Sequence, residues 1–273
     1  MEDHNSISPG SLKSRGLGKR TMVLGVMLML FCSLMFVASI GTVSASPDTT
    51  VTDDITTDTI WTEAGSPYWL DESITVWEGT TLTIEPGVVV NCMPGRQITV
   101  EGTLKALGSE SERVLFTGYY DNMLPLLFTP TSTNSCLQYT TFMYAYTAVE
   151  VYDCDVAMSH VEFMYMDAGI KWFSEECLEL DTCNFQFFGM GVLMADETVC
   201  LKMTDCQFSY GTFGVLALAD EACLAVKESH FQNVQFGMIA LACSDLNMKV
   251  CDTVFEDCCE FLERASMPEG FAM

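Results

Sequence analysis

Apolar and polar residues alternate within a block that occurs three times without insertion, at 177–199, 200–222 and 223–245. The blocks read CLELDTCNFQFFGMGVLMADETV, CLKMTDCQFSYGTFGVLALADEA and CLAVKESHFQNVQFGMIALACSD. The second and fourth residues of each block are apolar, and this period of two places them on one face of a short strand. A phenylalanine follows at the ninth position and a glycine at the fifteenth. The blocks therefore predict repeated strands.

The phase of the repeat extends beyond the three blocks with small slips. The interval between successive phenylalanines at the ninth position lengthens slowly from coil to coil. One block is too short to bury its own apolar face, whereas stacked copies share a continuous core. The pattern predicts a solenoid whose phenylalanines point inward and stack, as Phe142, Phe163, Phe185, Phe208, Phe231 and Phe255.

Short β-branched segments separated by turn residues precede the repeat. Residues 75–90 read TVWEGTTLTIEPGVVV, and a related unit, QITVEGTLKAL, follows at 97–107. Segments this short, interrupted by Glu-Gly and Pro-Gly turns, predict strands and no long helix.

Three stretches of this region carry a resemblance to a known family. Ser66-Pro67-Tyr68, then SITVWEGTTLTIEPGVVV, then ITVEGTLKALGSESERVLFTG are similar to the entry coils of right-handed parallel β-helix surface proteins, the pectate-lyase-like superfamily in its broad sense. The resemblance covers roughly residues 60–262. It implies an all-β fold, a right-handed parallel β-helix of about eight or nine coils that advance by ~4.8 Å each. A leucine-rich repeat is the alternative, because Leu-x-Leu-x-x-Cys-x-Phe imitates its strand pattern.

The N-terminal region has the composition of a targeting segment. Residues 1–20 form a basic region that we expect in the cytoplasm. Residues 21–45 predict an apolar helix, either a cleaved signal peptide ending at Val43-Ser44-Ala45 or an uncleaved anchor that crosses the membrane through residues 21–43. Residues 46–59, rich in Thr, Asp and Ser, predict a solvated spacer before a β-helix domain at 60–273. Export to the cell surface or beyond follows from either interpretation.

The charge of the chain restricts its partners. The net charge is −25, and 35 acidic residues stand against 8 basic ones after residue 45, because Glu2, Asp3 and four of the twelve basic residues precede it. Nucleic acid is excluded as a partner, since a polyanion requires a basic surface. Cations, a polysaccharide, a protein or the cell envelope are compatible partners.

Cysteines occupy two repeat positions. One column holds Cys177, Cys200 and Cys223, and a second holds Cys183 and Cys206. Neighbours in a stack lie about one strand spacing apart, within the reach of a disulfide. Both disulfides, which an exported protein forms, and small buried thiols are compatible with these columns.

Acidic turns recur at nearly the same position of successive coils. Their carboxylates are candidate calcium ligands, because calcium prefers oxygen; the alternative is a solvated ridge that discourages lateral sheet pairing. The candidates are Glu175, Glu176, Asp196, Glu197, Asp220 and Glu221. No other metal or cofactor is indicated.

Polysaccharide cleavage is the activity that the resemblance brings to mind, but its catalytic motifs have no match. The paired aspartates, His-Gly and Arg-Ile-Lys elements of β-helical polygalacturonases are missing, and fold alone does not establish an enzyme. We expect a non-catalytic, exported envelope, adhesion or ligand-binding module, with a polysaccharide lyase or glycoside hydrolase as the alternative. An exposed aromatic surface is expected among Tyr119, Tyr120, Tyr144, Tyr146, Tyr165 and Trp172.

Overall fold

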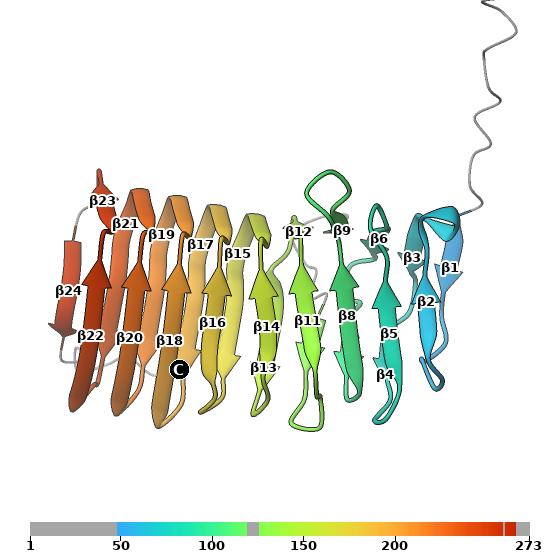
Figure 1. Ribbon diagram of the computed structural model, residues 1–273, viewed down its shortest axis with the longest axis horizontal. Helices are drawn as coiled ribbons and strands as arrows, with labels where there is room; N and C mark the ends of the chain where they lie inside the picture. Colours follow the sequence, from blue (N-terminus) through green and yellow to red (C-terminus); the bar gives the residue numbers. More distant parts are fainter. Residues whose placement is uncertain (1–47, 119–125, 259, 266–273) are drawn as a thin grey trace, which may run out of the picture. The chain divides into compact units, whose positions relative to one another are not determined.

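The computed structural model describes residues 48–118, 126–258 and 260–265, and these residues form a right-handed parallel β-solenoid (Figure 1). One wall is a nine-stranded parallel sheet, called sheet B, with one strand from each of about nine coils. Its strands in stacking order are β2 (Thr59–Trp61), β5 (Thr81–Ile84), β8 (Thr103–Leu107), β11 (Ser135–Gln138), β14 (Val156–Ser159), β16 (Cys177–Asp181), β18 (Thr198–Thr204), β20 (Glu221–Lys227) and β22 (Asp245–Cys251).

The second sheet, sheet A, closes the other side of each coil and changes its form along the stack. In the first coils it has two short strands per turn: β1 (Thr49–Val51), β3 (Tyr68–Leu70), β6 (Val89–Cys92), β9 (Val114–Gly118) and β12 (Thr140–Met143) on one path, and β4 (Ile74–Val76), β7 (Ile98–Val100), β10 (Leu126–Phe128) and β13 (Thr147–Tyr152) on the other. Both paths pair with β15, so from there each coil has one long bent strand. These are β15 (Glu162–Phe173), β17 (Asn184–Ala195), β19 (Gln207–Leu218) and β21 (His230–Leu241), followed by β23 (Val254–Glu256) and β24 (Glu260–Ala265).

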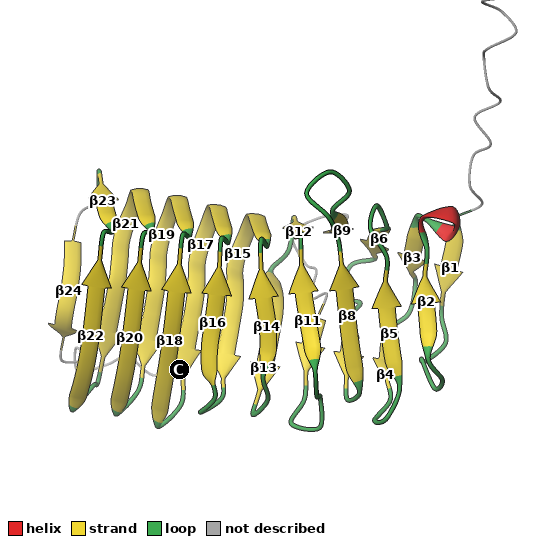
Figure 2. Ribbon diagram, viewed as in Figure 1, coloured by secondary structure: helices red, strands yellow, loops and turns green. Residues whose placement is uncertain are grey.

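Strands and turns make up nearly all of the described residues (Figure 2). Within them the one helical element is a 3₁₀ turn, η1 (Glu63–Gly65). The two parallel sheets decide against the leucine-rich repeat. The predicted apolar helix at 21–45 lies outside the described residues, and among those residues no helix is long and apolar enough to cross a membrane.

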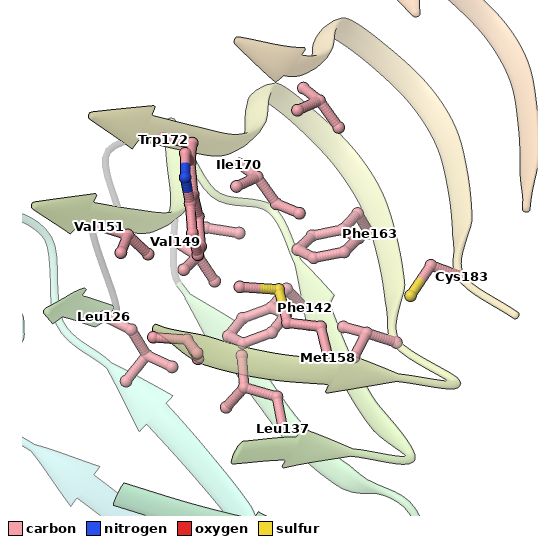
Figure 3. Packing of buried hydrophobic residues seen from close by; sticks show 14 of the residues in the cluster. Leu126, Leu137, Phe142, Val149, Val151, Met158, Phe163, Ile170, Trp172 and Cys183 are labelled. Carbon is pink, nitrogen blue, oxygen red and sulfur yellow. The ribbon is translucent and has the colours of Figure 1, made fainter. Parts of the chain in front are cut away.

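The core is a set of stacked columns, as the period-two pattern predicts. Leu178, Leu201 and Leu224 pair in register and are fully buried. The phenylalanine stack is confirmed: consecutive rings lie parallel with centroids 4.4–5.5 Å apart from Phe142 to Phe255, and Phe116 extends the stack at 5.0 Å. Figure 3 shows Phe142 and Phe163 pointing into the interior beside Leu137, Met158 and Ile170.

The recurrent glycines have a steric reason. A Cβ added to Gly214 would collide with the carbonyl oxygen of Gly237 and lie 2.7 Å from the Phe231 ring. The equivalent contacts recur at Gly191, where the Phe208 ring would be 2.6 Å away. Only glycine therefore fits beneath the phenylalanine of the next coil.

Residues 48–59 belong to the first coil, which differs from the solvated spacer that their polar composition predicts. β1 pairs with β3, Val51 and Ile55 are buried, and Ile55 bridges to Val76. Asp54 accepts hydrogen bonds from the backbone of Thr75 at 2.8 Å and from Trp77 Nε1 at 3.1 Å. Val51 and Ile55 are enough to attach this segment to the core, because its threonine and aspartate side chains make hydrogen bonds with the backbone at the exposed edge of the stack.

Candidate functional site: a polar corner cleft

From β11 to β22, each coil leaves sheet B through a residue with positive φ. This corner column runs through Tyr139, His160, Thr182, Asp205, Glu228 and Asp252, with φ between 45° and 55°. The left-handed conformation is unfavourable for residues with a side chain, by about 1–3 kcal/mol each. The stack imposes it because, from Tyr139 to Glu228, the backbone N–H of each residue of the column donates to a carbonyl of the next coil, for example His160 to Asp181 at 2.9 Å.

A cleft of about 630 Å³ lies along this corner. It is lined mainly by polar side chains from five coils: Glu110, Arg113, Tyr139, His160, Glu162, Thr182, Cys183, Asn184, Asp205 and Gln207. Carboxylates, amides and hydroxyls predominate in this lining. The cleft is therefore suited to a ligand rich in hydroxyl or other neutral hydrogen-bonding groups.

Arg113 holds the wall of the cleft together. Its Nε donates to Thr141 Oγ1 at 2.8 Å and lies 3.4 Å from Glu162 Oε2, and Thr141 in turn donates to Glu162 Oε2 at 2.9 Å. Its Nη2 donates to the backbone carbonyls of Thr140 and His160. One side chain thus connects three coils, and because most of it is buried this network is stronger than a surface ion pair.

Aromatic rings and two unsatisfied atoms complete the wall. Tyr139 stacks on His160 at 4.3 Å, with the Arg113 guanidinium 5.8 Å from the Tyr139 ring centre. His160 Nδ1 and Asn184 Oδ1 are buried without a hydrogen-bond partner in the described structure. Buried polar atoms without partners are rare, and at a cleft wall they are typical of places where water or a ligand completes the network.

A ladder of exposed aromatic rings follows a second column with positive φ, two residues after the phenylalanine stack. Tyr144, Tyr165, Phe187 and Tyr210 stack face to face at 4.9–5.3 Å and are 40–54% exposed. Because the faces are turned toward each other, the ladder presents ring edges and tyrosine hydroxyls to solvent. This geometry suits a protein contact better than sugar stacking, which requires an open ring face.

The structure corrects and extends the expected aromatic surface. Tyr144, Tyr146 and Tyr165 are exposed, but Trp172 is fully buried, and its Nε1 donates to the Glu176 carbonyl at 3.0 Å. Trp172 follows Ile170 by two residues and so shares its inward face. Phe187 and Tyr210 belong to the ladder and were missed, although both stand two residues after an inward phenylalanine. Tyr119 and Tyr120 lie outside the described residues.

The two cysteine columns differ. Cys177 and Cys200, in register on β16 and β18, form a disulfide, while Cys223 in the next coil is an exposed free thiol. Cys183 and Cys206 are buried free thiols, and the Cys183 N–H lies 3.4 Å from Cys206 Sγ. The hydrogen bond with Cys183 and burial raise the pKa of Cys206 far above its ordinary value. Its role in the stack is that of a small buried residue.

The acidic turns lie at the corner where sheet A passes into sheet B. Glu197 and Glu221 are exposed, and their backbones join successive coils through a 3.0 Å hydrogen bond. Within the described residues no three or more His, Cys, Asp or Glu side chains gather in a way that could hold a metal. The candidates Glu175, Glu176, Asp196, Glu197, Asp220 and Glu221 stay a prediction without a coordination geometry.

Three lysines of the coils are engaged in ion pairs. Lys171 Nζ lies 2.9 Å from Glu150 Oε1, Lys202 Nζ lies 2.7 Å from Glu179 Oε1, and Lys227 pairs with Glu228 at 3.0 Å. The hydrogen bond and the charge of Glu179 raise the pKa of Lys202. The hydrogen bond and the charge of Glu228 likewise raise the pKa of Lys227. A raised pKa favours the protonated form of Lys202 and Lys227, which is unfavourable for a catalytic base.

Comparisons with known proteins give one short sequence similarity. A stretch of 62 residues, 23% of this chain, is 36% identical to part of "Protein bark beetle" of Drosophila melanogaster. The match spans 2% of that protein's length. No family model matches the chain, and no solved structure matches it.

Proposed function

We propose that the protein is a non-catalytic, exported β-helix at the cell surface, whose corner cleft binds a neutral, hydroxyl-rich ligand such as a polysaccharide chain. The observation that carries the proposal is the cleft itself, with hydrogen-bonding side chains that recur from coil to coil. Thr182 and Asp205 follow one another along the corner, as do Asn184 and Gln207, which pair in register. A linear ligand along the stack would meet similar groups about every 4.8 Å.

The state of Arg113 favours binding over cleavage. A lyase needs a base free to take a proton, whereas this guanidinium already serves the carbonyls of two coils and the Thr141–Glu162 pair. Glu162 in turn accepts from Thr141 and faces Arg113. These groups fix the wall of the cleft, and a wall that is already organised binds a ligand at a smaller entropic cost.

The test measures binding and cleavage together. The chain is incubated with neutral and acidic polysaccharides, with and without calcium, while bound ligand and new chain ends are followed. We expect binding to a neutral polysaccharide without new chain ends. New ends that disappear on chelation would instead support the lyase or hydrolase and the acidic turns.

Matched glutamine variants locate the ligand. Gln207 lines the cleft, whereas Gln186 stands on the neighbouring strand outside it. Removing one hydrogen bond costs about 1 kcal/mol, so Gln207→Ala should weaken binding roughly fivefold. Gln186→Ala should leave the affinity unchanged; equal effects of the two changes would place the ligand elsewhere.

Exposure at the cell surface is tested by protease treatment of intact cells. We expect the β-helix to be accessible from outside, with the basic residues 1–20 protected if the apolar segment is retained as an anchor. A chain that becomes accessible only after lysis would contradict export.

A further inference from the structure

Three cysteines lie in one column on the outer face of sheet B. β16, β18 and β20 are neighbouring parallel strands (Figure 1), and Cys177 is in register with Cys200, which is in register with Cys223. Each cysteine precedes a fully buried leucine of its strand, so the three side chains point away from the core. Toward β22 the column ends at Asn247. The three sulfur atoms therefore follow one another along the stack.

The column contains one disulfide and one free thiol. Cys177 and Cys200 are joined, with their Cα atoms 4.4 Å apart. Cys223 is a free thiol and is exposed, whereas Cys177 and Cys200 are half-buried. An exposed thiol can lose its proton to solvent, and the thiolate is the form that attacks a disulfide. A nucleophile and a bond that it can attack are therefore neighbours in the column.

Two different disulfides fit this column equally well. Cys200 is the direct neighbour of Cys177 on one side and of Cys223 on the other. Each pair is separated by about 4.8 Å, one strand spacing, and a disulfide spans Cα distances of about 4.4–6.8 Å. Cys177 and Cys223 are two strand spacings apart, about 9.6 Å, which is too far for a disulfide. Both possible disulfides therefore share Cys200.

We propose that this column is a thiol–disulfide exchange site, in which the disulfide moves by one coil from Cys177–Cys200 to Cys200–Cys223 and back. The Cys223 thiolate attacks Cys200 Sγ, and its electron pair forms the new S–S bond. The bond between Cys200 and Cys177 breaks, and Cys177 leaves with the electron pair and takes up a proton. One disulfide and one thiol are present before and after, so the step needs no oxidant or reductant. The free thiol moves from β20 to β16.

The order of the three cysteines favours this step. Displacement at sulfur requires the attacking, central and leaving sulfur atoms to lie nearly in line. In-register residues of a parallel sheet follow the stacking direction, so Cys223 approaches Cys200 from the side opposite to Cys177. The strands keep their register in both forms, and the Cys200 side chain turns from one neighbour to the other. The stack thus holds the reacting groups in place before the reaction.

The second cysteine column provides a contrast. Cys183 and Cys206 also occupy one repeat position in successive coils, but both are buried free thiols, and the next coil has Ser229 at this position. The raised pKa of Cys206 keeps its thiol protonated. This pair provides neither a disulfide to attack nor an exposed thiol, so we expect exchange in the outer column alone. The exchange is independent of the ligand proposed for the corner cleft.

Trypsin distinguishes the two disulfides. Cleavage after Lys171, Lys202 and Lys227 places Cys177 and Cys200 in one peptide, 172–202, and Cys223 in the next, 203–227. The Cys177–Cys200 bond therefore stays inside one peptide, whereas the Cys200–Cys223 bond joins two. Mass spectrometry of the alkylated digest identifies the linked cysteines.

The test is a time course on the purified full chain without reductant. The form with the Cys177–Cys200 bond is isolated at pH 4, where protonated thiols exchange too slowly to matter, and is shifted to pH 8. Samples are quenched with acid and alkylated with N-ethylmaleimide. We expect the joined peptides to appear in the monomer until the two forms are within about tenfold of each other, because their spacings are equal. The rate should be unchanged by tenfold dilution. Absence of the joined peptides, or a rate that falls on dilution, would overturn the intramolecular exchange.

Three serine variants test the shared role of Cys200. Cys177→Ser should make the joined peptides the main product, whereas Cys223→Ser should abolish them and keep the bond within 172–202. Cys200→Ser should leave Cys177 and Cys223 as free thiols, because they are too far apart. A free Cys200 thiol in Cys177→Ser, or a Cys177–Cys223 bond in Cys200→Ser, would contradict the proposed geometry. If a variant fails to fold, the time course of the wild type decides.

Discussion

The entry coils from β1 to β12 and the regular coils from β15 to β22 both stack in register, but they differ in strand length and in the residues that form their turns. Entry strands are three to five residues long, and several of their turns use glycine with positive φ, at Gly79, Gly87 and Gly95. Regular coils have strands of up to twelve residues and turn through Asp, Asn, Thr, Glu, Ala or an aromatic residue with positive φ. Local turn chemistry shapes the first coils, whereas contacts between coils shape the later ones.

Glycine shows this difference most directly. A Cβ on Gly79 or Gly95 would meet no atom within 4 Å, so glycine is required there only by its φ. In the regular coils Gly214 has no space for a Cβ at all. The same residue type therefore serves backbone conformation at one end of the solenoid and close packing at the other.

The largest expected effect is that of Gly214→Val. The new side chain would collide with the backbone of Gly237 and the Phe231 ring, so we expect a loss of more than about 5 kcal/mol, enough to unfold the coils. Thermal melting followed by circular dichroism measures it. Gly79→Ala, the control from the entry coils, should cost only about 1–2 kcal/mol for its left-handed backbone. Equal losses of stability in the two variants would show that glycine has the same role in the entry coils and in the regular coils.

The next effect is expected for Phe208→Ala. Phe208 is buried between Phe185 and Phe231, with ring centres 4.4 and 4.6 Å away, so its loss should cost about 3–5 kcal/mol in urea unfolding. Tyr210→Ala, two residues later on the exposed ladder, should cost less than about 1 kcal/mol. An unchanged melting temperature for Phe208→Ala would contradict the inward stack.

Loss of the disulfide should have a somewhat smaller effect. Cys177 and Cys200 are separated by 23 residues in the sequence, so Cys200→Ser should destabilise the oxidised protein by about 3 kcal/mol through the loss of this closed loop. Cys223→Ser, in the same column but without a disulfide, should change the stability by less than about 0.5 kcal/mol. Both are measured by urea unfolding without reductant, and a Cys200 variant as stable as the wild type would show that the stack needs no covalent link.

The smallest effect is expected from the thiol of Cys92 in the entry coils. Burial raises its pKa from 9.0 to about 12, so the unfolded chain loses this proton at lower pH than the folded protein. The thiol's contribution to stability is complete below pH 9 and declines as the pH rises from 9 toward 12, by at most about 1.4 kcal/mol per pH unit. Urea midpoints between pH 8 and 11 should fall less steeply for Cys92→Val than for the wild type; parallel curves would exclude a buried, protonated thiol.

Much of the fold could be predicted from the sequence, because its columns consist of one residue type at one period. Phe163, Phe185 and Phe208 recur at a nearly constant interval, and their stack appears as expected. Residues 48–59 could not be placed in this way. Their Thr and Asp side chains have no apolar period, and they join the first coil through hydrogen bonds such as those of Asp54.

The candidate sites were less predictable. Arg113 lies outside the repeat phase, and its contact with His160 spans 47 residues, so no local pattern links the two. The aromatic ladder has the same intervals as the phenylalanine stack, but its column mixes tyrosine with phenylalanine, and this change of residue type conceals it in the sequence. Trp172 was expected on the surface because it lies outside the phase of the phenylalanine stack. It is buried, because its strand alternates and it shares the inward face of Ile170.

The sequence by itself determined that short strands stack with a nearly constant period, that the leucine and phenylalanine columns face the core, and that the chain is strongly acidic. These properties depend on side-chain chemistry and on the alternation of a single strand. The tertiary structure alone decided which side chains of different coils meet: the Arg113 cleft, the Cys177–Cys200 disulfide and the stacked rings of the aromatic ladder. Such neighbours are set by the register between coils, and a slip of one residue turns each side chain to the other face of its sheet.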